Sequence, residues 1–321
     1  MSKYSNKYVL ETGIGLQDVD GLKNSEYFLN ESKDYISGKI TLEELDHIIS
    51  SYYENKQSIN EKCEEADKVS IRIAKIISED SFTFTVGQFL SIHKSLFDGI
   101  IPSAGKMRGY NFSKEEWVLD GASVTYGDYR ELENTLNYDF SQEKLFNYKN
   151  LSIDDVIDHL ARFVANLWQI HVFEEGNTRT TAVFFIKYLR SLGFDVTNDA
   201  FAKDAWYFRN ALVRANYTNI VKGVYEDYTF LIMFLKNLIL GEDNILKNRD
   251  LHITSNNVTY TKREEKVINL LVNNPKIKIE EIANAVSVSP RTIKTLLSNL
   301  TQKGKIERIN GKRYGSWKVN L

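Results

Sequence analysis

The chain is poor in the residues that cross-link proteins and in those that interrupt helices. Cys63 is the only cysteine among 321 residues, which excludes an intrachain disulfide and a cysteine-based zinc site. Only three prolines are present, and apolar residues recur at helical spacing, so we expect a mainly α-helical protein. The N-terminus lacks a signal-peptide core, and the most apolar run, Phe230 to Leu240, is short and contains Lys236 and Asn237. We therefore expect a cytoplasmic protein without a membrane span.

Charge is unevenly divided along the chain. From Thr261 onwards there are 13 Lys and Arg against 5 Glu and no Asp, a net charge of +8, whereas the preceding residues carry 28 basic and 38 acidic residues, a net charge of −10. Opposite charges indicate two domains with different partners. Residues 241–260 are polar and show little periodicity, so we expect them to form a linker.

The segment HVFEEGNTR, residues 171–179, is the most informative stretch. Apolar residues at helical spacing flank it on both sides, which predicts a helix–loop–helix crossover. A helix that begins near Asn177 or Thr178 presents unpaired backbone N–H groups and the positive end of its dipole, and such an end binds phosphate. Gly176 allows the backbone to turn sharply, and Asn177 is a good cap residue.

Three ionisable side chains accompany this turn. His171 can act as a general base near neutral pH. Glu175 is a hard oxygen ligand, suited to Mg²⁺ shared with substrate phosphates, and Arg179 on the first helical turn can grip phosphate. A single histidine or a single Gly-Asn pair is usually structural, but their combination in this order predicts a catalytic nucleotide site.

These residues resemble the Fic family signature, H-x-F-x-[DE]-G-N-x-R-x-x-R. Members of that family transfer AMP from ATP to a Ser, Thr or Tyr hydroxyl of a protein. The resemblance implies that His171 deprotonates the hydroxyl, that Glu175 holds Mg²⁺, and that Arg179 stabilises charge on the departing pyrophosphate. It also implies that the backbone of Gly176, Asn177 and Thr178 cradles the phosphates.

The chain departs from the signature at its second arginine, where it has Ala182. In the family this arginine grips the γ-phosphate and pairs with an inhibitory glutamate. Residues 50–55, SSYYEN, resemble the inhibitory motif [ST]-x-x-x-E-[GN], with Ser50 and Glu54 on one helix face. The resemblance implies a class II arrangement, in which Glu54 enters the nucleotide site. Without an arginine at 182, inhibition by Glu54 is expected to be weaker; the alternative is an exposed polar helix face.

Two further segments resemble parts of a Fic domain. Residues 112–126 are expected to form a β-hairpin flap to which an extended target segment adds as a strand, the alternative being an ordinary surface hairpin. Asn216 lies where family members contact the nucleoside, and its alternative role is a helix C-cap.

The basic C-terminal segment resembles a winged helix-turn-helix of bacterial regulators. Helices are expected over 262–273, 279–286 and 291–303, followed by a hairpin whose turn is Asn310-Gly311. In such folds the third helix enters the major groove and the wing touches the DNA backbone. The residues expected to face DNA are Ser289, Arg291, Thr292 and Lys294 on the helix and Lys312 and Arg313 on the wing. The alternative is a wing that docks a protein.

The sequence thus predicts a mainly α protein with a helical Fic core, a small β-hairpin flap and a C-terminal winged helix. The expected order is an N-terminal helical region with the inhibitory helix (1–80), the core (81–240), the linker (241–260) and the winged helix-turn-helix (261–321). The expected activity is adenylyl transfer from ATP, with Mg²⁺, to another protein or to the chain itself. Alternatives are another nucleotide donor, removal of AMP, or a DNA-binding regulator that senses a nucleotide. Helical domains of this kind can also pair as a homodimer.

Overall fold

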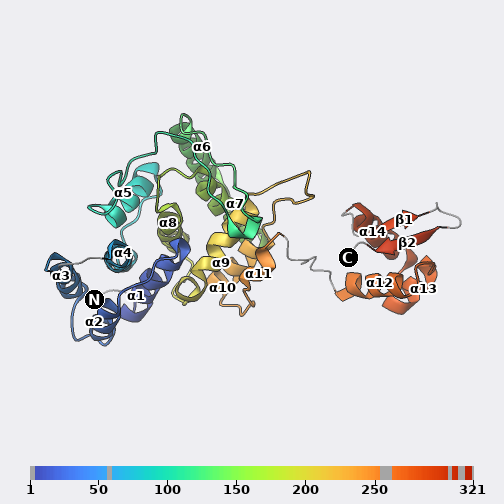
Figure 1. Ribbon diagram of the computed structural model, residues 1–321, viewed down its shortest axis with the longest axis horizontal. Coiled ribbons are helices and arrows are strands. Elements are labelled where there is room, and N and C mark those ends of the chain that lie inside the picture. The colour runs from blue at the N-terminus through green and yellow to red at the C-terminus, as the bar shows by residue number, and fades with distance from the viewer. Residues whose placement is uncertain (1–3, 56–59, 254–261, 303–305, 310–314, 320–321) are drawn as a thin grey trace. The chain divides into compact units, whose positions relative to one another are not determined.

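The computed structural model describes residues 4–55, 60–253, 262–302, 306–309 and 315–319 (Figure 1). They divide into two compact units. The first comprises residues up to Thr218 together with Tyr225–His252, and the second comprises Asn219–Val224 together with the residues from Ile253 onwards. The N-terminal region and the predicted Fic core therefore form one unit rather than two.

The first unit is built from helices joined by irregular segments. In chain order these are α1 (Asn6–Gly15), η1 (Leu16–Asp20), α2 (Glu26–Ile36), α3 (Leu42–Glu54), α4 (Glu61–Ser78), α5 (Val86–Phe97), η2 (Trp117–Leu119), α6 (Leu132–Leu145), α7 (Ile153–Ile170), α8 (Asn177–Ser191), α9 (Ala200–Ala215), α10 (Thr229–Leu240) and α11 (Asn248–Leu251). Among the described residues no helix is both long and apolar enough to cross a membrane.

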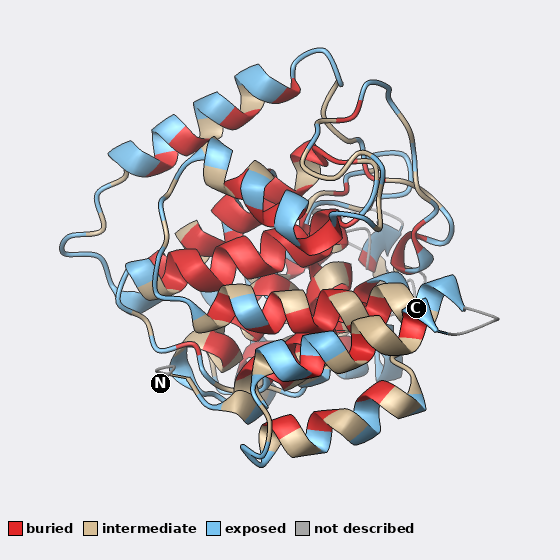
Figure 2. Cartoon of the chain, turned by 90° about the vertical axis from the view of Figure 1, so that its left-hand side faces the viewer, coloured by how far each residue is buried: buried red, intermediate tan, exposed pale blue. Residues whose placement is uncertain are grey.

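Helix α8 lies at the centre of this unit. Every residue from Asn177 to Leu189 is buried, and the helix packs against α4, α5, α7 and η1. Figure 2 shows buried helices in the interior, surrounded by helices whose outer faces are exposed. A helix that is buried on all sides has a fixed position and orientation, so the N-terminus of α8 is well suited to carry a site.

Helices α1 to α5 and α7 begin at a residue whose side chain caps the first backbone N–H groups. Ser152 accepts a hydrogen bond from the Asp155 N–H at the start of α7, and Thr41 does the same for the Glu44 N–H of α3. No side chain caps α6, α9, α10 or α11. The same is true of α8, whose N-cap is Gly176. Its first N–H groups are therefore left to other partners.

Two expectations about irregular segments are corrected. Residues 112–126 contain no strands; they fold back through η2, with the Glu116 N–H donating to Ala122 O at 3.0 Å. The neighbouring residues Val118 and Leu119 are both buried, which breaks the alternation that a half-buried strand needs. The predicted linker contains α11, where Leu251 is fully buried, so residues up to His252 belong to the first unit.

The second unit has the predicted winged helix-turn-helix architecture. It consists of α12 (Lys262–Asn273), α13 (Ile279–Val286), α14 (Pro290–Gln302) and an antiparallel pair, β1 (Ile306–Ile309) and β2 (Ser316–Val319). Ile306 pairs with Val319 and Ile309 with Ser316. A separate apolar core that includes Val267, Ile282 and Ile293 holds the helices together. The predicted turn Asn310-Gly311 and the wing residues Lys312 and Arg313 lie outside the described residues.

Candidate active site

The loop of residues 171–176 joins two helices with left-handed residues at both ends. Helix α7 ends at His171, which has φ 52° and ψ 61°, and α8 follows Gly176, which has φ 72°. Asn177 fixes the loop between them, because its Oδ1 accepts from the Phe173 N–H at 2.9 Å and its Nδ2 donates to Phe173 O at 2.7 Å. Trp168 Nε1 donates to Thr178 Oγ1 at 2.9 Å, which ties α7 to α8.

Gly176 is required by sterics as well as by its backbone angles. A Cβ at this position would lie 2.4 Å from the ring of Phe97. Phe173 is buried beneath the loop, where its ring stacks on His93 at 3.7 Å. The apolar packing of these rings therefore presses the loop backbone into one conformation.

His93 supports the loop through both ring nitrogens. The Gly105 N–H donates to Nδ1 at 2.8 Å, so Nδ1 is unprotonated and Nε2–H donates to Glu175 O at 3.1 Å. Burial lowers the pKa of His93 to about 4. The imidazole is therefore neutral near pH 7 and holds the carbonyl that precedes Gly176.

The imidazole of His171 is enclosed by aromatic rings. It stacks on Tyr126 at 3.9 Å, and the rings of Phe112 and Trp168 approach it edge-on at 5.5 and 5.4 Å. Neither ring nitrogen has a hydrogen-bond partner. Burial and, after it, the positive charge of Lys114 lower the pKa of His171 well below its ordinary value. A neutral imidazole with a free lone pair can accept a proton.

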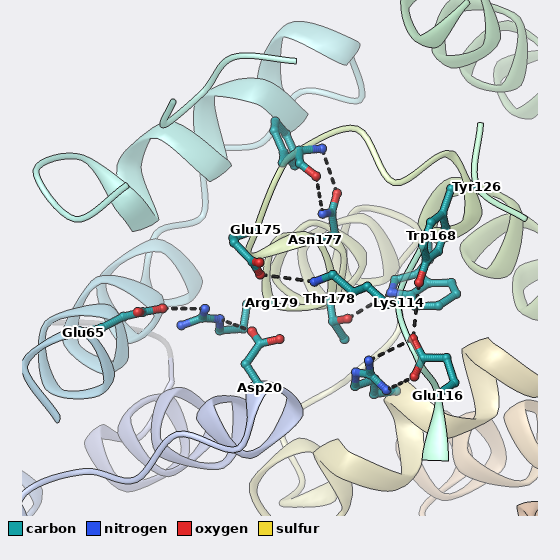
Figure 3. A network of polar contacts seen from close by, with 12 residues as sticks. Asp20, Glu65, Lys114, Glu116, Tyr126, Trp168, Glu175, Asn177, Thr178 and Arg179 are labelled. Carbon is teal, nitrogen blue, oxygen red and sulfur yellow. Dashed lines mark hydrogen bonds and ion pairs between the residues drawn. The ribbon is translucent and has the colours of Figure 1, made fainter. Parts of the chain in front are cut away.

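The segment of residues 112–126, here called the flap, covers this histidine. A bidentate ion pair fastens it to α9: Arg209 donates to both carboxylate oxygens of the buried Glu116, at 2.7 and 3.0 Å. The Tyr126 hydroxyl donates to the same carboxylate at 3.3 Å. Figure 3 shows Tyr126 and Glu116 together with Trp168. Beneath the flap, His171 is buried, with 4% of it exposed.

Arg179 is buried and turned towards the N-terminal part of the chain. Its Nη2 donates to Glu65 Oε1 at 2.7 Å and its Nη1 to Gln17 Oε1 at 3.0 Å. The Asp20 carboxylate lies 2.9 Å from Nε of Arg179 (Figure 3). The two groups form an ion pair but not a hydrogen bond. Two carboxylates from η1 and α4 thus occupy the guanidinium that was expected to bind phosphate.

Glu175 is exposed, and its carboxylate meets a lysine of the flap. Lys114 Nζ lies 3.2 Å from Glu175 Oε2, and the side chains are 27% and 59% exposed. The described residues contain no group of three or more His, Cys, Asp or Glu that could enclose a metal. A single exposed carboxylate beside a phosphate-binding helix end nevertheless fits magnesium, which in such sites is held by one or two carboxylates and substrate phosphates.

The structure does not bring the predicted inhibitory pair to this loop. Glu54 is exposed at the end of α3, and Ser50 is half-buried. The helix instead buries Leu45, Ile49 and Tyr53 as it packs on α2 and α4. The carboxylates that contact the signature arginine Arg179 are those of Asp20 and Glu65, and the inhibitory role of Ser50 and Glu54 stays a prediction.

Asn216 and Ala182 lie within the helical framework. Asn216 is the C-cap of α9, and its amide donates to Ala165 O at 3.0 Å and to Leu212 O at 2.9 Å. Its structural role is therefore visible, and contact with a nucleoside stays a prediction. Ala182 is fully buried and offers no charge.

In the second unit, α14 exposes the residues that were expected to face DNA. Arg291, Thr292 and Lys294 are all exposed. Ser289 Oγ accepts from the Thr292 N–H at 3.2 Å and so caps the helix. A groove of about 710 Å³ is lined by Arg263, Glu264, Ser289, Arg291, Thr292, Thr295, Leu296 and Asn299. Lys294 does not line this groove.

Several residues around the loop could not be identified from sequence. Four of these residues make contacts at the flap: Lys114, Glu116, Tyr126 and Arg209. The other four contact the loop or Arg179: Gln17, Asp20, Glu65 and His93. They lie between 45 and 162 positions from their partners. No local sequence pattern marks them.

Comparison with known proteins agrees with this architecture. Residues 83–189 match the model of the Fic/DOC family, and residues 261–307 match that of winged helix-turn-helix DNA-binding domains. No curated protein matches the chain. The first unit is thus a Fic domain with additional helices, and the second is a winged helix-turn-helix domain. The chain thus contains a region that matches the Fic/DOC family, followed by one that matches winged helix-turn-helix DNA-binding domains.

Solved structures with low sequence identity are also similar. The N-terminal Fic domain of Bep8 from Bartonella sp. 1-1C is 19% identical, with 58% of this chain and 88% of that chain covered and a TM-score of 0.43. A Fic family protein from Desulfovibrio desulfuricans G20 is 14% identical, with 98% and 87% covered and a TM-score of 0.44. BepC from Bartonella tribocorum, with bound AMPPNP, is 17% identical, with 58% and 94% covered and a TM-score of 0.41.

Proposed function

We propose that this protein is an adenylyltransferase that transfers AMP from ATP to a protein hydroxyl, with His171 as the general base. The observation that carries the proposal is the position of His171. It ends α7 with both ring nitrogens unpartnered, in the same short loop as the N-terminus of α8, which no side chain caps. A proton acceptor and a phosphate-binding helix end are thus held close together.

The proposed reaction is an in-line displacement at the α-phosphorus. The target hydroxyl oxygen forms a bond to phosphorus as His171 accepts the hydroxyl proton. The bond between phosphorus and the oxygen that bridges the α- and β-phosphates breaks, and pyrophosphate leaves with the electron pair. The backbone N–H groups of Gly176, Asn177 and Thr178 would bind the phosphates. Glu175 would hold magnesium, which supplies charge neutralisation to the phosphates.

Two features of the site oppose the reaction in the arrangement described. The flap encloses His171 through Tyr126, and Asp20 and Glu65 hold Arg179. We assign self-inhibition to this carboxylate pair, because phosphate and carboxylate compete for the same guanidinium. Nucleotide binding and flap opening would therefore precede catalysis.

The first experiment is incubation of the full chain with labelled ATP and Mg²⁺, followed by peptide mapping of any attached mass. The expected product is a peptide of this chain or of an added target that carries one AMP. His171→Ala should abolish incorporation, and His47→Ala, which alters an exposed histidine on α3, should not. Incorporation that persists in His171→Ala would show that another group is the base.

The same assay separates the alternative activities. Mass spectrometry after incubation with each nucleotide in turn identifies the donor, and release of AMP from a modified protein would identify the reverse role. The identity of the nucleotide donor needs this measurement, because Ala182 cannot make the contact that was expected to select a γ-phosphate.

A second function, DNA binding, is favoured by one observation in the second unit. Its α14 exposes Arg291, Thr292 and Lys294 on one helix within a segment of net charge +8. We propose that this helix binds DNA through the groove that contains Ser289 and Arg291. A nucleotide-sensing regulator without transferase activity would show DNA binding and no incorporation.

A further inference from the structure

Lys114, which the sequence did not identify, forms an ion pair with the carboxylate of Glu175, the proposed metal ligand. Its Nζ is 3.2 Å from Glu175 Oε2 and 5.8 Å from the centre of the Phe112 ring. Its backbone N–H donates to Ser123 Oγ, which fixes the flap on which it stands. After burial, the positive charge of Lys114 is the main cause that lowers the pKa of His171.

The arginines around the loop already have partners that would be costly to lose. Arg179 is bound by Asp20, Glu65 and Gln17. Arg209 is bidentate to Glu116, a carboxylate that is 1% exposed. To remove either partner would leave a buried charge without compensation.

Two more arginines are committed to backbone carbonyls. Arg108 is buried and donates to His171 O at 2.7 Å and to Tyr110 O at 2.6 Å. Arg214 of α9 donates to Leu251 O at 2.8 Å. Both therefore stabilise chain segments rather than present a free charge to a ligand.

Lys114 differs because its partner is exposed. An ion pair between solvent-accessible side chains contributes only about 0–1 kcal/mol, so Lys114 can exchange partners at little cost. If Mg²⁺ bound Glu175, the Lys114 ammonium would be released from this carboxylate. It would then be free to contact the phosphates of a nucleotide bound at the N-terminus of α8. Lysine is suited to this exchange, since its ammonium is a compact charge on a flexible stem.

We infer that Lys114 holds the β- and γ-phosphates of the nucleotide, as the substitute for the arginine that is absent at Ala182. The same ammonium neutralises Glu175 when no nucleotide or metal is bound. This inference rests on the proposed function, in that it assumes a nucleoside triphosphate at the N-terminus of α8. Lys114 would thus bind the terminal phosphates of the nucleotide, rather than the base, the ribose or the target hydroxyl.

The test is calorimetric binding of ATP and of AMP to the full chain in the presence of Mg²⁺. Lys114→Met should raise the Kd for ATP about tenfold, the effect of removing one charged interaction of about 1.4 kcal/mol, and should change the Kd for AMP less than twofold. Lys114→Arg should restore ATP binding to within about threefold. The matched control is Lys106→Met, which removes an exposed lysine from the segment that leads into the flap.

Equal Kd values for ATP in the wild type and Lys114→Met would overturn the inference, as would an equal loss for ATP and AMP or a wild-type chain that binds no ATP. Labelled incorporation distinguishes this outcome from failure of the proposed function. If Lys114→Met leaves KM for ATP unchanged in an active enzyme, the inference fails and the function stands. If the wild type binds ATP through Lys114 but transfers no AMP, the function fails and the inference stands.

Discussion

At the scale of single residues, the loop is determined by Gly176 more than by any charged group. Its φ of 72° makes a side chain costly through backbone strain, and the Phe97 ring, which would lie 2.4 Å from an added Cβ, opposes one by steric overlap. Gly99 has the same φ of 72° but nothing within 4 Å of an added Cβ. Substitutions at these two glycines therefore distinguish the cost of backbone strain from the cost of steric overlap.

Alanine substitutions at these glycines should differ in cost. We expect Gly99→Ala to lower the free energy of unfolding by about 1 kcal/mol, the cost of a left-handed alanine. Gly176→Ala should cost about 2 kcal/mol more because it overpacks against Phe97. Urea denaturation of both variants measures the difference. Equal midpoints would show that the Phe97 ring moves aside without cost.

His93 makes stability depend on pH. Its pKa is about 4 in the folded chain against an ordinary value of 6.5, so below pH 6.5 the unfolded chain binds more protons than the folded one. The free energy of unfolding should therefore fall as the pH is lowered from about 7 towards 4. The lowered pKa of His171 also makes the free energy of unfolding fall as the pH is lowered.

The variant His93→Gln should flatten this dependence, since glutamine does not titrate. The measurement is the urea midpoint at several pH values, with the exposed His47→Gln as the control. A slope that is as steep in His93→Gln as in the wild type would contradict the assignment to His93.

At the scale of elements, the contact between η1, α4 and α8 carries the proposed inhibition. Glu65 of α4 lies 24% exposed beside the buried Arg179, where it would compete with phosphate. Glu65→Gln should raise labelled AMP incorporation about fivefold, equivalent to about 1 kcal/mol of lost competition. Glu64→Gln, which alters the partner of Lys68 on the same helix, is the control.

A decrease in incorporation by Glu65→Gln, together with a lower unfolding midpoint, would identify the carboxylate as a structural partner of Arg179. Incorporation that rises equally in Glu64→Gln would point to a general effect of charge on α4.

The sequence predicted the helices of the site far better than the contacts between them. The 3.6-residue periodicity on both sides of residues 171–179 identified α7 and α8, and the glycine and asparagine located the turn. The partners of Arg179 could not be found in this way, since Asp20 and Glu65 reach it through tertiary packing. The flap was mistaken for a hairpin because its aromatic residues favour strands and its glycine favours a turn, whereas Val118 and Leu119 are buried together.

At the scale of the whole molecule, the division of charge coincides with the division into units. The acidic first unit carries the Fic site, and the basic second unit, from Ile253 onwards, carries α14. The composition of the two segments predicted this organisation, because each has its own apolar core and its own charge. The join between them was less predictable, since α11 extends the first unit into a polar segment without clear periodicity.

DNA binding by the second unit should be electrostatic and should depend on α14. The double variant Arg291→Ala/Lys294→Ala should weaken binding of the full chain to a duplex about tenfold or more. It should also reduce the slope of log K against log salt by about 0.9 for each phosphate that the protein no longer neutralises. Fluorescence anisotropy at several salt concentrations measures both quantities. Lys276→Ala, on the exposed turn before α13, should have little effect, and an unchanged slope in the double variant would favour a protein partner.

The position of Trp168 has an optical consequence. Its indole is 1% exposed and meets both His171, at 5.4 Å, and Tyr126, at 5.9 Å. Departure of the flap would expose the indole to water and shift its emission to longer wavelength. Because Trp117 lies on the flap itself, Trp117→Phe would remove its signal, and the fluorescence of Trp168 would then report in real time whether His171 is covered.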